Sequence, residues 1–202
     1  MADQRSRLVL ASGSKIRRQL LEHAGVAITV DPADIDEHVA VKEMQRSETS
    51  IPHLACGLAV RKAEAVSRRH PGALVIGADQ MLELDGRMLT KAGTPAIARQ
   101  VLMSLRGQDH HLHSGVALVR DGQALWSYVG SATLHVRPFS DAWLDSYVAR
   151  LSDILTTTVG AYQLEGEGIQ LFERIEGDYF TILGLPLLEL LAELRRHGVI
   201  ME

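Results

Sequence analysis

The chain has little of what disulfide-rich, membrane-spanning or nucleic-acid-coating proteins require. Its single cysteine, Cys56, cannot form an intramolecular disulfide and has no second cysteine with which to hold a zinc ion. No stretch approaches the roughly 20 consecutive apolar residues of a membrane span, and the opening MADQRSRLVLAS has too short an apolar run for a signal peptide. A net charge of −4 argues against coating of nucleic acid or an anionic membrane. We therefore expect a cytoplasmic protein that has no nucleic-acid or membrane partner.

The chain does have the composition of a soluble globular protein, with 46% hydrophobic and 23% charged residues. Its 202 residues are enough to bury a substantial core, and we expect a single domain over residues 1–202. A second lobe, if present, would be the hairpin-rich stretch of about residues 107–136, although no composition shift marks its boundary.

Strands and helices alternate along the sequence, which predicts an α/β fold with a mixed sheet. The expected strands are 8–11, 26–30, 74–78, a hairpin at 84–89, the pair 111–119 and 124–136, and short strands near 169–172 and 179–183. The expected helices are 15–23, 51–69, 96–105, 141–150 and 186–197, and residues 31–38 are expected to form an acidic loop.

The segment LASGSKIRRQLL, residues 10–21, places a strand end directly before a helix. Ser14 is a good N-cap residue, but the first turn then carries cations such as Lys15 and Arg17, which oppose the helix dipole. An anion bound by backbone N–H groups, serine hydroxyls and arginine would remove this conflict. A capped surface helix with solvated basic residues explains the pattern about equally well, because the glycine spacing of a P-loop is missing.

Two further polar residues occupy positions that the pattern expects to be apolar. Lys62 falls in the middle of the apolar face of the helix at 51–69, where it either extends to the edge of the core or enters a polar pocket. Asp79 follows the buried strand VIGA, at the strand end where α/β proteins commonly bind ligands. Carboxylates in the acidic loop, including Glu37, are oxygen ligands suited to Mg²⁺ or Mn²⁺. The HHLH segment at 110–113 lacks a third ligand of clear spacing, so zinc binding is not expected.

Basic groups for phosphates, carboxylates for a metal and a polar strand end together indicate hydrolysis of a phosphoanhydride or phosphoester. The segments LASGSKIRRQLL, GADQ, RGQDHHLHSGVAL, VGAY, GEGIQLFERIEGDYF and LGLPL also resemble, in order and spacing, the Maf family of nucleoside triphosphate pyrophosphatases. The similarity runs from about Leu8 to Arg195. It implies a fold related to the inosine-triphosphate pyrophosphatases, a mixed twisted sheet with flanking helices and two lobes around a central cleft, and often a homodimer.

The resemblance also implies a reaction, in which a divalent cation (Mg, Mn or Co) supports cleavage of the triphosphate to the monophosphate and pyrophosphate. Asp79 matches the family's catalytic aspartate, the expected general base for water, and Glu37 matches an acidic residue linked to the metal. The positions that match its triphosphate-binding residues are Ser12, Ser14, Arg17, Lys62 and Lys91. On this basis Lys62 is expected to enter the polar pocket.

Three positions bear on the substrate: Ile16, Gln80 and Glu165. The branch of the family that acts on dTTP and UTP typically has Arg, Thr and Gln there, whereas the branch that acts on 7-methyl-GTP has Trp, Gln and Glu. Since a carboxylate can accept two hydrogen bonds from the N1–H and N2–H₂ donors of guanine, Glu165 favours 7-methyl-GTP or a related guanine nucleotide. Two alternatives stay open: a dTTP/UTP or broad-specificity pyrophosphatase, and a non-catalytic nucleotide-binding regulator of cell division. The second alternative is compatible with Ala92, where the family usually has proline.

Overall fold

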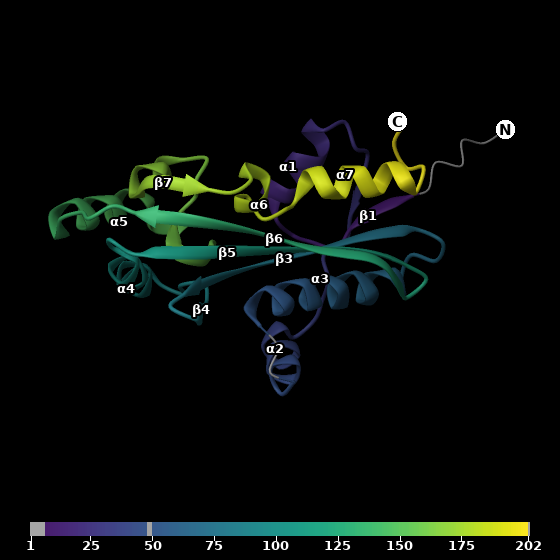
Figure 1. The fold of residues 1–202 in the computed structure, drawn as a ribbon, viewed down its shortest axis with the longest axis horizontal. Helices are drawn as coiled ribbons and strands as arrows, with labels where there is room; N and C mark the ends of the chain where they lie inside the picture. The colour runs from purple at the N-terminus through teal and green to yellow at the C-terminus, as the bar shows by residue number, and fades with distance from the viewer. Residues whose placement is uncertain (1–6, 48–49, 202) are drawn as a thin grey trace. The chain divides into compact units, whose positions relative to one another are not determined.

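A computed structural model describes residues 7–47 and 50–201 (Figure 1). The strands are β1 (Leu8–Leu10), β2 (Thr29–Val30), β3 (Leu74–Leu84), β4 (Arg87–Leu89), β5 (Asp109–Arg120), β6 (Gln123–Val136) and β7 (Phe172–Glu176). The α-helices are α1 (Lys15–His23), α2 (Glu37–Gln45), α3 (Ile51–Ser67), α4 (Pro95–Leu105), α5 (Asp141–Leu155), α6 (Tyr179–Ile182) and α7 (Leu187–Arg196). Two 3₁₀ turns, η1 (Val159–Ala161) and η2 (Glu167–Leu171), precede β7. Within the described residues, no helix is both long and apolar enough to cross a membrane.

The strands form one mixed sheet in the order β2-β1-β3-β5-β6-β7, with β4 added to β3. The strand β1 is parallel to β2 and to β3, whereas the β3–β4 and β6–β7 pairs are antiparallel. Two tight turns consist of an Asp-Gly pair in which both residues have positive φ, 49° and 74° at Asp85-Gly86 and 50° and 76° at Asp121-Gly122. These are the backbone angles of a type I′ hairpin turn, so both predicted hairpins are confirmed. The predicted α/β class with a mixed sheet and flanking helices is confirmed as well.

The described chain packs as two compact units. The first unit comprises the described parts of 1–79, 114–130 and 178–202, and the second comprises 80–113 and 131–177. The strands β3, β5 and β6 each contribute residues to both units. The stretch 107–136, considered above as a possible second lobe, is therefore divided between the two units.

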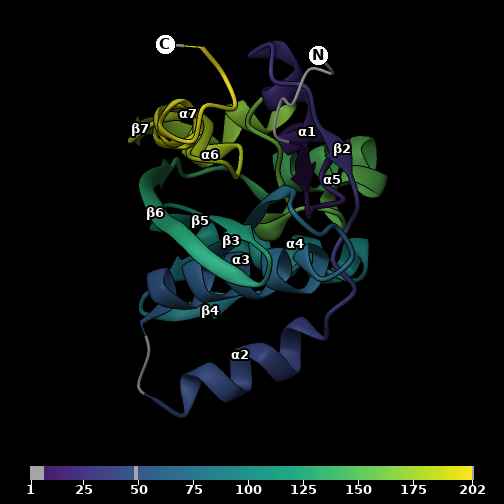
Figure 2. The same cartoon turned by 90° about the vertical axis from the view of Figure 1, so that its right-hand side faces the viewer.

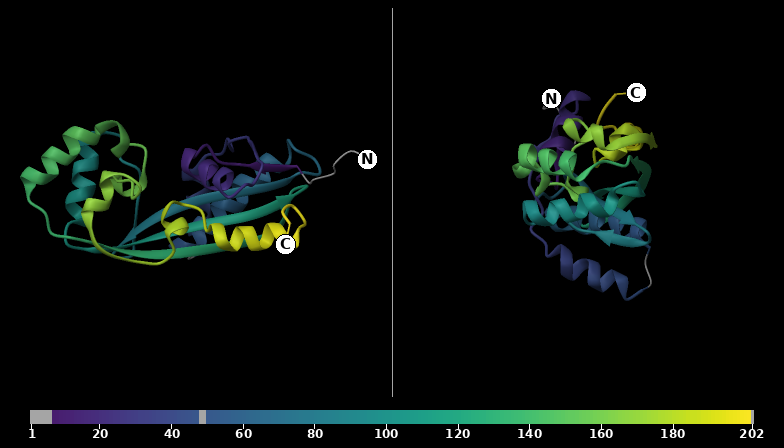
Figure 3. Two further views of the ribbon diagram at one scale, coloured as in Figure 1. Left: turned by 90° about the horizontal axis from the view of Figure 1, so that it is seen from above. Right: turned by 90° about the vertical axis from the view of Figure 1, so that its left-hand side faces the viewer.

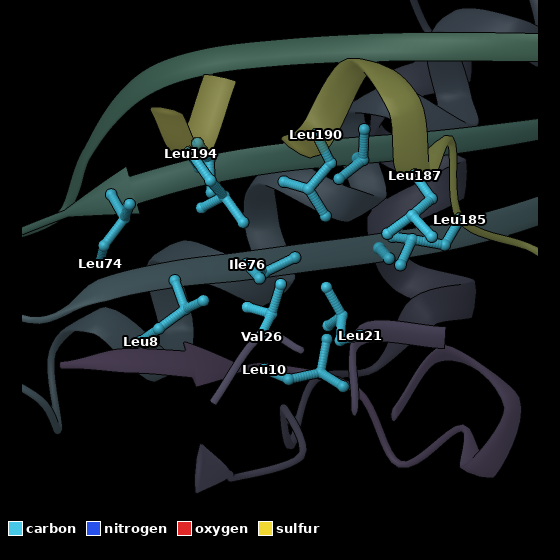
Figure 4. Packing of buried hydrophobic residues seen from close by; sticks show 13 residues of the cluster. Leu8, Leu10, Leu21, Val26, Leu74, Ile76, Leu185, Leu187, Leu190 and Leu194 are labelled. Atoms are coloured by element: carbon cyan, nitrogen blue, oxygen red, sulfur yellow. The ribbon is translucent and has the colours of Figure 1, made fainter. Parts of the chain in front are cut away.

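In the first unit, helices cover both faces of the strands (Figure 1). On one face α3 approaches closely, since a Cβ at Gly77 would lie 1.9 Å from the Ala59 carbonyl oxygen. Figure 2 shows α2 on the far side of α3 from the strands. On the other face, α1 and α7 bury leucines against β1 and β3 (Figure 4). The labelled members of this cluster are Leu8, Leu10, Leu21, Val26, Leu74, Ile76, Leu185, Leu187, Leu190 and Leu194. Burial of this apolar surface stabilises β1 and β3, the strands next to the candidate site.

In the second unit, α4 packs along α5 (Figure 3). The core of this unit contains a buried polar pair, in which His110 Nε2 lies 2.7 Å from the Tyr162 hydroxyl. Burial lowers the pKa of His110 to about 3, so that the ring is neutral at pH 7.

Four sequence-based expectations on secondary structure need correction. The strand at 74–78 continues as β3 to Leu84, so Asp79 lies inside a strand instead of at its end. The acidic loop ends early, because Asp36 caps the missed helix α2 by accepting a hydrogen bond from the Val39 N–H. The strand at 179–183 is wrong, since Asp178 caps the short helix α6 there. The strand near 169–172 is the 3₁₀ turn η2, and β7 begins only at Phe172.

Candidate active site

The turn between β1 and α1 is built by two serines. Ser14 caps α1, and its Oγ accepts a hydrogen bond from the Arg17 N–H at 3.4 Å. The Ser12 hydroxyl oxygen accepts from the Ser14 N–H at 3.3 Å and from Arg17 Nη1 at 3.1 Å. Each hydroxyl keeps a proton that can be donated, so the turn offers O–H groups beside the N-terminus of α1. Ile16 is half-buried on the first turn of this helix.

Arg17 does not extend freely into solvent, as a simple phosphate clamp would. Its Nε donates to the Gly184 carbonyl at 2.8 Å, and its Nη1 donates to the Ala78 carbonyl at 2.9 Å as well as to Ser12. Burial lowers the pKa of Arg17, and the negative charges of Asp79 and Glu37 oppose that shift. The guanidinium stays charged and joins three segments of the first unit.

Lys62 lies on the buried face of α3, where the helical periodicity places it. Only 9% of the residue is exposed, and its ammonium does not extend out of the core. The Nζ atom donates to Asp79 Oδ1 at 2.6 Å and lies 2.7 Å from Glu37 Oε1. A buried ammonium needs such partners, and Asp79 and Glu37 provide them.

Asp79 is the most enclosed carboxylate of this group, with 7% of the residue exposed. Burial raises the pKa of Asp79 above its ordinary value, while the positive charges of Lys62 and Arg17 pull it back down. The raised pKa makes Asp79 a stronger proton acceptor than an exposed aspartate. Among the described residues, Asp79 Oδ2 has no hydrogen-bond partner, which leaves this oxygen available to a water molecule.

The pair Asp79 and Glu37 could take part in binding a divalent metal. One oxygen from each lies within 2.7 Å of the same Lys62 ammonium, so two carboxylates already surround one cation. In residues 7–47 and 50–201, no group of three or more metal-binding side chains comes together. The site therefore fits Mg²⁺, which is commonly held by one or two carboxylates together with substrate phosphates, and not a metal caged by protein alone.

Comparison with known proteins shows the family of this chain. Residues 7–197 match the family described as Maf-like protein. The chain belongs to this family. It is 50% identical to a protein of Maricaulis maris named nucleoside triphosphate pyrophosphatase, over 98% of this chain and 100% of that protein. It is 47% identical to a Rhizobium etli protein named 7-methyl-GTP pyrophosphatase, over 96% of this chain and 98% of that protein. A HAM1 protein of Coxiella burnetii covers 65% of this chain and 73% of its own at a TM-score of 0.41 and 16% identity, so the fold assignment rests on the family match.

The remaining Maf-type positions belong to the second unit. Gln80 is half-buried in β3, Lys91 is exposed after β4, and Glu165 is exposed in a turn just before η2. The structure brings Ser12, Ser14, Arg17, Lys62, Asp79 and Glu37 together in the first unit. The roles of Lys91, Gln80 and Glu165 stay predictions from the family pattern.

The histidines of HHLH have partners of their own in this Maf-like chain. His113 lies with Nδ1 2.8 Å from Ser131 Oγ and Nε2 2.9 Å from Glu83 Oε2, and His111 Nδ1 lies 3.0 Å from Thr133 Oγ1. These hydrogen bonds run across neighbouring strands of the sheet and account for both rings as structural groups.

Sequence reasoning missed the backbone acceptors of the site. The carbonyls of Ala78 and Gly184 hold Arg17 by hydrogen bonds, although Gly184 lies 167 residues further along the chain. The LGLPL segment marked Gly184 as part of the family pattern, but no local pattern links it to Arg17.

Proposed function

We propose that this chain hydrolyses nucleoside triphosphates to the nucleoside monophosphate and pyrophosphate, with Asp79 as the general base. The observation that carries the proposal is the buried Asp79, whose Oδ1 accepts a hydrogen bond from Lys62 while its Oδ2 accepts none from the described residues. Relatives named nucleoside triphosphate pyrophosphatase, at 50% identity over nearly the full chain, support the same reaction.

In the proposed reaction, the carboxylate of Asp79 and the cations Lys62 and Arg17 have separate roles. A water molecule gives a proton to Asp79 Oδ2 while its oxygen forms a bond to the α-phosphorus. The bond between the α-phosphorus and the oxygen bridging to the β-phosphate breaks, and pyrophosphate leaves. Lys62 and Arg17 offset the negative charge that develops on the phosphate oxygens, and the Ser12 and Ser14 hydroxyls donate hydrogen bonds to them.

A divalent cation is the expected cofactor, with Mg²⁺, Mn²⁺ or Co²⁺ as candidates. Glu37 would hold it together with substrate phosphate oxygens, next to Asp79. When bound, the cation supplies Lewis-acid stabilisation of the phosphate charge. The family pattern further favours a homodimer, and the single cysteine fits a cytoplasmic location.

The preferred substrate is 7-methyl-GTP or a related modified guanine nucleotide, whose removal would cleanse the nucleotide pool. Gln80 and Glu165 match the 7-methyl-GTP branch, and relatives at 47–48% identity carry that name. Ile16 replaces the tryptophan of that branch and removes an aromatic ring that could stack on a methylated base. We therefore expect a preference that is weaker than that of an enzyme with tryptophan at this position.

A nucleotide panel tests both parts of the proposal. Pyrophosphate release from 7-methyl-GTP, GTP, dTTP and UTP is measured with Mg²⁺, Mn²⁺ or Co²⁺, and with EDTA. We expect kcat/KM to be highest for 7-methyl-GTP and activity to vanish in EDTA. Glu165→Gln should move the ratio towards dTTP and UTP by roughly 10-fold, because an amide matches the pyrimidine edge better than a carboxylate does. Glu167→Gln is the matched control, since Glu167 instead pairs with Arg150 at 3.1 Å.

The other outcomes of the panel decide against the proposal. A preference for pyrimidines in the wild type would overturn the role of Glu165 but leave the reaction in place. Release of orthophosphate in place of pyrophosphate would overturn the reaction. Tight nucleotide binding without pyrophosphate release, with each of the three metals, would favour the non-catalytic regulator.

A further inference from the structure

The Ala78 carbonyl lies where the parallel β1–β3 ladder stops. In this ladder Leu8 pairs with Leu74 and Leu10 with Ile76, and the Ala11 N–H donates to the Ile76 carbonyl at 2.8 Å. A parallel strand that continued would supply the next N–H two residues later, opposite Ala78. The chain instead turns through the serine segment into α1, and Arg17 Nη1 donates to the Ala78 carbonyl at 2.9 Å. The guanidinium thus supplies the hydrogen bond that the strand no longer provides.

Gly184 provides the other support of that guanidinium. Its carbonyl accepts from Arg17 Nε at 2.8 Å. The residue has φ of +95°, a region that side-chain-bearing residues rarely adopt, and a Cβ there would lie 3.3 Å from both Nε and Nη2 of Arg17. Glycine is required at this position for its backbone angle and for the room that it leaves to the guanidinium.

We propose that Gly184 is a positioning residue for the reaction: it seats Arg17 against the Ala78 carbonyl, and this contact fixes the peptide that carries Asp79. The inference rests on the proposed function, and it goes beyond it by giving Arg17 a second task besides phosphate binding.

The physical link runs through one peptide plane. The Ala78 carbonyl belongs to the peptide whose N–H is that of Asp79, so holding the carbonyl fixes the plane from which the Asp79 side chain extends. On its other side, Asp79 is held by Lys62 at 2.6 Å. A side chain at position 184 would press on a guanidinium that already has three hydrogen bonds, and the displacement would pass to the Ala78 carbonyl. A Cβ at 3.3 Å requires the guanidinium to move by a few tenths of an ångström. Since an error of about 1 Å in a catalytic group can lower the rate by around 100-fold, a shift of this smaller size should lower it several-fold.

The test compares Gly184→Ala with Gly198→Ala. Gly198 also has positive φ, +66°, but a Cβ there would meet nothing within 4 Å, so this control places alanine at a positive φ without touching Arg17. Steady-state kinetics on the nucleotide that the wild type cleaves best are normalised to folded protein by circular dichroism. We expect Gly184→Ala to lower kcat by roughly 3- to 10-fold with KM changed by less than about twofold, and Gly198→Ala to leave both unchanged.

A double-mutant cycle with Arg17→Ala separates positioning from general damage. If Gly184 acts through Arg17, Gly184→Ala lowers kcat no further in the Arg17→Ala background. If the two substitutions act independently, the fold-losses in kcat of the single variants multiply in the double variant. Arg17→Lys keeps the positive charge but lacks the planar fork whose Nε and Nη1 reach the Gly184 and Ala78 carbonyls, so we expect it to lose kcat as Gly184→Ala does. This lysine variant keeps the test decisive if Gly184→Ala does not fold.

Three outcomes would overturn the inference while the proposed function stands. They are a fully active Gly184→Ala variant, effects that multiply with those of Arg17→Ala, and an Arg17→Lys variant that raises KM with kcat intact. A wild type that releases no pyrophosphate from any nucleotide would instead overturn the proposed function itself, and the positioning role with it.

Discussion

Two aspartates of the first unit have similar partners and opposite pKa shifts. Asp79 lies beside the cations Lys62 and Arg17, yet burial raises the pKa of its carboxyl. Asp31 accepts two hydrogen bonds from Arg69, at 2.9 and 3.1 Å, and its Oδ2 lies 2.7 Å from His70 Nε2. These hydrogen bonds lower the pKa of Asp31, because its side chain stays partly exposed and loses little hydration.

The comparison shows that desolvation, more than the number of cationic partners, decides what such a cluster can do. Where the folded state lowers the pKa of an aspartate, its ionised form stabilises the fold at neutral pH. Where the folded state raises that pKa, ionisation costs stability. The cluster at Asp31 therefore ties the segment after β2 to the end of α3. The cluster at Asp79 keeps a costly charge next to cations, which suits the proposed role of Asp79 as a base.

The same substitution in both clusters gives the largest expected contrast. We expect Asp79→Asn to lower kcat by about 10²- to 10⁴-fold, because an amide cannot accept the proton of water. Its melting temperature should fall less than that of Asp31→Asn, since the neutral amide avoids the cost of burying a charge. Lys62 also still pairs with Glu37 in this variant. Asp31→Asn should retain its activity. Pyrophosphate release and thermal melts of both variants measure these effects on activity and stability. An active Asp79→Asn variant would contradict the difference in role between the two aspartates.

Removal of the Lys62 ammonium is expected to have the next largest effect. Lys62→Met leaves two carboxylates facing each other without an ammonium, and breaking a buried ion pair typically costs ~3–5 kcal/mol. We expect a loss of unfolding free energy in that range and a kcat/KM at least about 10-fold lower, because the phosphate charge also loses a cation. Arg61→Met is the matched control one residue away. Arg61 pairs with Glu43 at the surface, where such pairs contribute ~0–1 kcal/mol. Equal effects in urea unfolding would contradict the view that burial separates the two pairs.

How much of the fold and of the candidate site could be predicted from the sequence depends on how far apart in the chain the contacting residues lie. The helix predicted at 15–23 is α1 residue for residue, because Ser14 and the apolar spacing are local signals. Lys62 was placed on the buried face of its helix by periodicity alone. The end of β3 was misjudged, since the local sequence does not show that a strand can continue through a buried aspartate paired with a lysine from α3.

The errors elsewhere have equally physical causes. Helix α2 was missed because its start is rich in acidic and turn-forming residues, although Asp36 was a readable N-cap. Helix α6 consists of Tyr, Phe, Thr and Ile, which favour strands, and the capping by Asp178 overrides that preference. The hydrogen bonds of Arg17 to Ala78 and Gly184 and the contacts of Asp31 with Arg69 and His70 join residues far apart in sequence. They exist only in the folded chain, and no pattern in the sequence encodes them.

The smallest expected effect is a pH-dependent difference at Asp31. Because the pKa of Asp31 is lower in the folded state than the unfolded value of about 3.9, its ionised form stabilises the fold above that pH. This stabilisation is lost as the pH falls through the lower pKa of the folded state. We expect Asp31→Asn to lower the melting temperature by roughly 1–3 °C between pH 5 and pH 7, and this difference to shrink below about pH 4. Asp85→Asn is the control, because asparagine also tolerates the positive φ of that turn. A difference that grew on acidification would mean that the Asp31 carboxylate is held at a cost, as in the Asp79 cluster.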